Sequence, residues 1–154
     1  MKLSYKQKGA ETVEFAIILP ILLLVLFGIM EYGVVLYDKA VITNASREAA
    51  RSGIAYRCPA LSSDEIATVV FNATSYAGNS LLYSFATGST SPNVTVSPTP
   101  STTATNCFAN SGNPLTVTVT YSYQFIALGG LMNFFVPGFT NPITLSATTV
   151  MNYE

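Results

Sequence analysis

The chain has 154 residues, a formal net charge of −1 and charged side chains at only 10% of its positions. This length accommodates one small domain with an appendage, and the charge gives no electrostatic reason to expect nucleic-acid binding. The sequence contains no histidine, the usual base for serine or cysteine nucleophiles, and its two cysteines match no metal-ligand spacing. We therefore expect no enzymatic activity, no cofactor and no metal site.

An apolar run from Phe15 to Tyr37, interrupted only by Glu31, is the first element of the chain. As a helix it would extend about 34 Å, which suits about 30 Å of bilayer hydrocarbon. Lysines precede the run at positions 2, 6 and 8, so the positive-inside rule predicts a cytoplasmic N-terminus and an exported C-terminal domain. A cleaved secretory signal is the alternative, but the run is too long for one and no small-residue cleavage pattern follows promptly. We expect a single-pass segment in a bacterial or archaeal-type cell envelope.

Four residues of this run are candidate helix-packing positions. Pro20 removes a backbone N–H and predicts a kink or a local loosening. Gly28 and Gly33 let a neighbouring helix approach closely. Proline and glycine are, however, both common in membrane helices. Glu31 lies several residues inside the outer boundary, where a carboxyl group reaches for the interface, is protonated or finds a partner on another helix. The fate of this carboxyl stays open.

The helical pattern continues beyond the membrane, because residues 38–56 contain no proline and a single glycine. Ala45, Ala49 and Gly53 recur every four residues and form a narrow ridge on which another helix can dock. A solvated amphipathic stem is the alternative. Together with the membrane run, the pattern predicts one helix from Ala10 to Tyr56, about 70 Å long and far longer than a small domain needs. We expect such a helix to be packed by something else.

The chain opens with a short basic leader and a glycine, followed by glutamates just before the apolar run. Glu14 and Phe15 stand at the fifth and sixth positions after Gly9, a pattern typical of type IV prepilins. More narrowly, GAETVEFAIILPILLLVLFGIMEYG followed by NASREAARSG resembles the TadE-like family of minor pilins from tight-adherence (Tad, Flp) type IVb pili. The resemblance covers about the first third of the chain.

The resemblance implies a role for each residue of this opening motif. Gly9 would be the last residue of a leader that a prepilin peptidase removes, which would leave a free amine on Ala10. Glu14, with Phe15, would set the register of subunits by pairing with that amine on a neighbour. This agrees with the cost of a carboxylate near hydrocarbon without a positive partner. The implied partners are the peptidase, other pilin subunits and the pilus assembly machinery, in the membrane or in an extracellular pilus.

The expected organisation is a prepilin leader at 1–9, a transmembrane helix and stem at 10–57 with its span at about 15–37, and an exported domain at 58–154. The expected function is that of a minor pilin or pseudopilin acting in pilus assembly and adhesion. Two alternatives stay open. One is a single-span envelope protein whose exported domain binds a ligand or partner without polymerising, and the other is a pseudopilin of a secretion machine.

The exported domain reads as a short helix packed on a small antiparallel β-sheet, which makes the fold class α+β. Ser62 and Glu65 form a capping-box pattern at the start of an amphipathic stretch, and Gly78 suits its end. Residues 115–125 alternate cleanly between apolar and polar side chains, residues 143–150 alternate at first, and residues 93–97 add a shorter strand.

Cys58 and Cys107 are candidates for a disulfide, because an exported domain meets an oxidising environment. The bridge would close a loop of about 49 residues and contribute on the order of 4 kcal/mol in the chain-entropy model. Two free thiols are the alternative.

The connection at 126–139 is unusually apolar for a segment between two strands. It either folds over the sheet to complete a small core or forms a contact patch for a neighbouring pilin, a membrane or a substratum. The residues that would form this patch are Leu131, Met132, Phe134, Phe135 and Phe139.

Overall fold

The computed structural model describes residues 7–55, 59–76, 79–84, 91–100, 111–126, 129–130, 138 and 141–153. Its elements, in chain order, are α1 (Gln7–Ile54), α2 (Ser63–Ala73), β1 (Ser75–Tyr76), β2 (Asn79–Ser80), β3 (Asn93–Ser97), β4 (Pro114–Tyr123) and β5 (Ile143–Asn152). A long apolar helix, a short helix and a small antiparallel sheet confirm the predicted α+β class.

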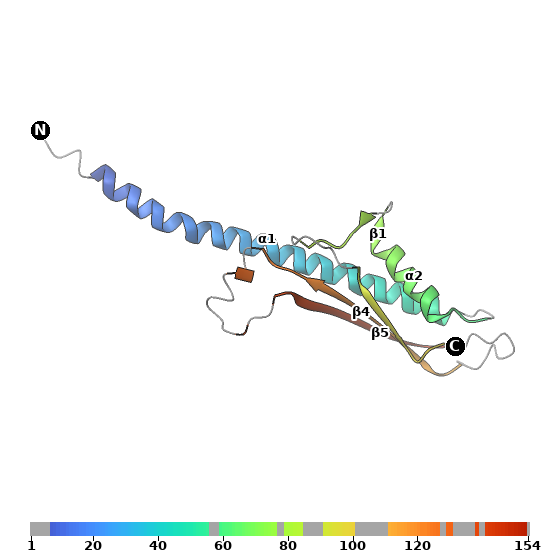
Figure 1. Cartoon of the computed structure of the whole chain (residues 1–154). Coiled ribbons are helices and arrows are strands. Elements are labelled where there is room, and N and C mark those ends of the chain that lie inside the picture. Colours follow the sequence, from blue (N-terminus) through green and yellow to red (C-terminus); the bar gives the residue numbers. More distant parts are fainter. Residues whose placement is uncertain are drawn as a thin grey trace, which may run out of the picture.

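Helix α1 dominates the shape of the molecule. It contains 48 residues, runs unbroken through Pro20 and is about 72 Å long at 1.5 Å per residue. This confirms the single continuous helix predicted from the sequence. Figure 1 shows that its N-terminal half projects away from the rest of the chain, whereas its C-terminal half lies along the sheet and α2.

The main sheet has the strand order β3-β4-β5, and both pairings are antiparallel. The predicted alternation is confirmed on β4, where the inward-facing side chains Leu115, Val117, Val119, Tyr121 and Tyr123 are all buried. Phe125 lies beyond the end of the strand and is half-buried. One face of the sheet is therefore apolar and packed, and the other carries mostly threonine, serine and asparagine, with Pro114 and Val150 among them.

The capping box predicted at the start of α2 is confirmed. The Ser62 N–H donates to Glu65 Oε2 at 2.8 Å, and the Glu65 N–H donates to Ser62 Oγ at 3.2 Å. The predicted end at Gly78 was wrong, because the helix ends at Ala73. The hydroxyls of Thr74 and Ser75 donate to the last helical carbonyls, at 2.9 Å to Val70 and 2.7 Å to Phe71, and thereby help to terminate the helix. The short β1-β2 hairpin follows.

The core lies between three components: the C-terminal half of α1, helix α2 and the inner face of the sheet. From α1 it includes Ile42, Ala45 and Ala49, and from α2 Ile66 and Val70, all at most 1% exposed. Burying a side chain of the size of valine or isoleucine stabilises a fold by about 1.5–3 kcal/mol. The C-terminal half of α1 is therefore part of the folded domain and cannot separate from it without loss of the core.

Candidate assembly site on the long helix

The N-terminal part of α1 has no packing partner among the described residues. From Gly9 to Met30 every residue is exposed except Gly28, which is half-buried. Large side chains such as Phe15, Ile21 and Ile29 are 60% or more exposed. A continuous apolar surface of this size is not stable in water and marks contact with lipid or with other helices. Among the described residues, α1 is long and apolar enough to cross a membrane, and no residue of its most apolar 18-residue segment is buried.

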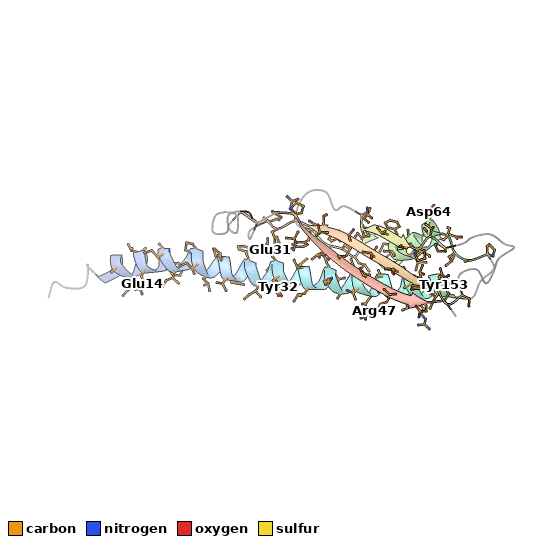
Figure 2. The ribbon with its side chains drawn as sticks, turned by 90° about the horizontal axis from the view of Figure 1, so that it is seen from below. Glu14, Glu31, Tyr32, Arg47, Asp64 and Tyr153 are labelled. Atoms are coloured by element: carbon orange, nitrogen blue, oxygen red, sulfur yellow. The ribbon has the colours of Figure 1, made fainter. Side chains whose placement is uncertain are left out.

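The residues of the opening motif lie together at the free end of this helix. Glu14 and Phe15 are exposed, and a Cβ atom added to Gly9 would meet nothing within 4 Å. Figure 2 shows Glu14 far from the folded domain, on the projecting part of the ribbon. The arrangement leaves Gly9 and Ala10 accessible to an enzyme and Glu14 accessible to another subunit. The roles in cleavage and registration stay predictions.

The free segment ends at Glu31, which is 5% exposed and is the first buried residue along the described part of α1. Val35 and Asp38 continue the buried stripe at i+4 and i+7, which is the spacing of one helix face. The opposite face, with Tyr32 and Leu36, stays exposed. The last two turns of the predicted span, 31–37, therefore lie against the folded domain. The free helix from Ala10 to Met30 is still about 32 Å long, enough to cross the hydrocarbon.

The Glu31 carboxylate has a partner within its own chain. Its Oε1 accepts a hydrogen bond of 2.9 Å from the backbone N–H of Ile126, just after β4. The hydroxyl of Tyr123 approaches the carbonyl oxygen of Glu31 at 3.5 Å. Figure 2 shows Glu31 near the end of the sheet that lies closest to the free helix. This contact ties the residue that follows β4 to the start of the stem.

Asp38 is a second buried acidic residue, and sequence reasoning did not identify it. Its side chain is 0% exposed, and Oδ1 accepts a 3.0 Å hydrogen bond from the backbone N–H of Tyr83. Its other oxygen, Oδ2, is buried and has no hydrogen-bond partner among the described residues. Desolvation raises the pKa of the Asp38 carboxyl from 3.8 to about 6, although the Tyr83 hydrogen bond opposes the shift.

The contact at Asp38 holds the segment 79–84 across α1. The rings of Tyr83 and Tyr37 add to it, with centroids 6.2 Å apart and planes inclined by 46°. Burial, with smaller contributions from the charges of Glu31 and Asp38, raises the pKa of Tyr123 to about 12. The junction between free helix and domain therefore contains two acidic side chains whose polar surroundings come from loops and from β4.

The small-residue ridge of the stem lies inside the domain. Ala45 and Ala49 are at most 1% exposed, and Gly53 is buried. A Cβ atom on Gly53 would lie 2.5 Å from Leu115 Cδ2 and 3.0 Å from Ile66 Cδ1. Beside the ridge, the hydroxyls of Ser46 and Thr149 share a 2.8 Å hydrogen bond. The elements that dock closely on the ridge are thus α2 and the sheet of the same chain.

The remaining predicted residues divide between exposed positions of α1 and segments that the structure does not describe. Pro20 is exposed, and a Cβ atom on Gly33 would meet nothing within 4 Å, so both positions are open to a partner. The predicted disulfide and the predicted contact patch lie outside the described residues; they are Cys58, Cys107, Leu131, Met132, Phe134, Phe135 and Phe139.

The fold and this site together define an α+β domain built on the second half of a helix whose first half is free and apolar, as in a single-pass membrane protein. Residues 9–51 match the family model described as TadE-like protein, which confirms the resemblance seen in the sequence. The matched segment covers most of α1 and none of the sheet. Over this segment the match associates the chain with proteins of Tad pili. No curated protein and no solved structure matches the chain.

Proposed function

We propose that the protein is a minor pilin or pseudopilin of a Tad (Flp) type IVb pilus. Its precursor would be inserted with the N-terminus in the cytoplasm and cut between Gly9 and Ala10 by a prepilin peptidase. The observation that carries the proposal is the free apolar helix from Gly9 to Met30, which bears the Gly-Ala and Glu-Phe pairs at its exposed end.

The same helix can exist in two apolar surroundings. In the membrane its exposed side chains contact lipid, and in a filament they contact the corresponding helices of other subunits, so transfer exchanges one apolar environment for another. The Glu14 carboxylate gains most from the transfer, because near hydrocarbon it lacks a positive partner, whereas a neighbour's Ala10 amine supplies one. This difference would favour the correct axial position of an incoming subunit.

The stem couples this transfer to the exported domain. Because Ile42, Ala45 and Ala49 belong to the core, a pull on the free helix acts directly on the folded domain and not through a flexible linker. The domain would therefore travel with the helix as one body. Adhesion or contact with other pilins would then be a property of the exposed faces of the sheet and of α2.

The proposal is tested by replacing Glu14 with leucine in cells that make the pilus. Glu14→Leu keeps the helix and the apolar segment, and we expect it to leave leader cleavage intact but to abolish recovery of the protein in sheared pilus fractions. Glu11→Leu is the matched control, because this exposed glutamate lies one turn away and has no assigned partner in a filament. Equal recovery of the wild type and both variants in pili would contradict the registration role. Retention of the wild type in membranes of piliated cells would favour the single-span envelope protein.

A further inference from the structure

The outer face of the main sheet, which points away from α1, carries almost only hydroxyl and amide side chains. We call it the hydroxyl face. Its polar members, exposed or half-buried, are Asn93, Thr95 and Ser97 of β3, Thr116, Thr118, Thr120 and Ser122 of β4, and Thr144, Ser146, Thr148 and Asn152 of β5. Its apolar members are Pro114 of β4 and Val150 of β5, which is 58% exposed. No other described element packs on this face in Figure 1, where α1 and α2 lie on the opposite side of the sheet.

The strand register arranges these groups in regular rows. Asn93, Thr120 and Ser146 form one row across the three strands, and Thr95, Thr118 and Thr148 form the next. Neighbouring strands lie about 4.8 Å apart, and side chains on one face recur about every 6.7 Å along a strand. Within the rows the Thr118 and Thr148 hydroxyls are 3.1 Å apart, and Thr120 donates to the Asn93 carbonyl at 3.4 Å. A hydroxyl has one donor and two acceptor positions, so the rows keep further hydrogen-bonding capacity.

The hydroxyl face also carries no charge. From Ile66 to Tyr153 the sequence contains no Asp, Glu, Lys or Arg. Lys39 of α1 reaches the edge of β5, where its ammonium group donates to the Ser146 carbonyl. A neutral face does not attract an anionic polymer electrostatically, and no ion has to be desolvated when a neutral partner docks.

From this arrangement we propose that the hydroxyl face binds a neutral polysaccharide. The hydroxyls of a glycan donate and accept as threonine hydroxyls do, and threonine methyl groups can contact the apolar C–H surface of a sugar ring. The inference rests on the proposed function in one respect: in a filament with α1 near its axis, the face opposite α1 is the one turned toward the surroundings. A long polymer can bridge several subunits, so weak contacts at each face sum to useful avidity.

The test uses the full chain in detergent micelles and a panel of insoluble neutral polysaccharides, namely cellulose, chitin, starch and mannan, with an alginate resin as the anionic comparison. The informative variant is the triple change Thr95→Val/Thr118→Val/Thr148→Val, which removes one row of hydroxyls but keeps side-chain shape and strand propensity. The corresponding triple change to serine keeps the hydroxyls. Thr68→Val removes an exposed hydroxyl from α2 and serves as the control away from the sheet.

We expect the wild type, the serine triple variant and Thr68→Val to be retained on at least one neutral polymer and not on alginate. Retention of the valine triple variant should be at least tenfold weaker, since each lost hydrogen bond costs roughly fivefold in affinity. Circular dichroism would show that the valine variant is folded. Absence of retention on all four polymers, or equal retention of the valine variant, overturns the proposal.

A change in sedimentation of the valine variant without a change in polysaccharide retention would also overturn it, because the face would then bind a second copy of the chain. These outcomes are independent of leader cleavage and of recovery in pili. A failure of this inference can therefore be told apart from a failure of the proposed function.

Discussion

Replacing Asp38 with asparagine should make the protein more stable at neutral pH. The Asp38 side chain is fully buried, one of its oxygens lacks a hydrogen-bond partner among the described residues, and desolvation raises its pKa from 3.8 to about 6. At pH 7.5 the carboxylate is ionised in both the folded and the unfolded chain, but only the folded chain bears the cost of burying the charge. Asparagine keeps an oxygen for the Tyr83 N–H and removes the charge.

The expected gain in the free energy of unfolding follows from the shift in the pKa of Asp38. A change from 3.8 to about 6 corresponds to an upper limit of about 3 kcal/mol. Water and detergent head groups near the junction screen part of this, so we expect a gain of about 1–2 kcal/mol at pH 7.5. For a chain of this size the midpoint of thermal unfolding should rise by about 3–6 °C.

The pH dependence of stability provides a second test of Asp38→Asn. As the pH falls through about 6, folded Asp38 binds a proton that the unfolded chain does not bind until about 3.8, so the wild type gains stability over this window. The variant lacks this gain, so the difference between the two proteins should shrink through this window and vanish only below about pH 3.8. The assay is thermal unfolding followed by circular dichroism in the same detergent at pH 7.5, at pH 6 and below pH 3.8.

Glu48→Gln is the matched control, because it removes an exposed carboxylate from the same helix and should leave the unfolding midpoint nearly unchanged. The carboxyl group of Glu31, the hydroxyl of Tyr121 and the carboxyl group of Asp38 all act electrostatically on Tyr123 at this junction, and Glu31, Tyr121 and Tyr123 are present in all three proteins. If Asp38→Asn is no more stable than the wild type at pH 7.5, and the pH dependence of the two proteins is the same, the buried charge is not a cost and the reasoning is refuted.

Three further substitutions test how the domain is attached to the helix. Gly53→Ala should lower the free energy of unfolding by about 1–2 kcal/mol, because the added methyl group would press on Leu115 and Ile66. Gly33→Ala is the control and should not lower it, because the space beside Gly33 is open. Equal effects of the two variants in thermal unfolding would contradict the packing. Glu31→Leu should lower the free energy of unfolding by about 1–3 kcal/mol, because it leaves the Ile126 N–H without its acceptor. Glu31→Gln keeps an acceptor oxygen and should lower it less. A larger loss of stability in the glutamine variant than in the leucine variant would exclude the contact. Ser62→Ala should cost about 1 kcal/mol through loss of the α2 cap, and an unchanged midpoint would argue against the capping box.

The elements of the domain could be predicted from local patterns. The alternation of Leu115, Val117 and Val119 indicates which face of β4 is buried, because side chains alternate along any strand. The start of α2 was equally readable, since Ser62 and Glu65 can satisfy each other wherever the helix lies. The end of α2 was not, because the hydroxyls of Thr74 and Ser75 help to end the helix before the glycine that suggested its limit.

The assembly of these elements could not be predicted in the same way. A ridge of Ala45, Ala49 and Gly53 shows that something packs closely, but small side chains accept a helix or a sheet, from the same chain or another. The burial of Asp38 depends on the segment around Tyr83 crossing α1, which no nearby sequence feature indicates. Glu31 was recognised as unusual from its apolar neighbours, yet its hydrogen-bond donor lies 95 residues away.

We propose that the free apolar helix belongs to a processed prepilin. The most direct test is the intact mass and N-terminal sequence of the protein purified from native membranes of a host with an active prepilin peptidase. We predict a chain that begins at Ala10, with the first nine residues removed. A chain that still begins at Met1 would contradict the account and leave a membrane-anchored domain that has no place in a pilus.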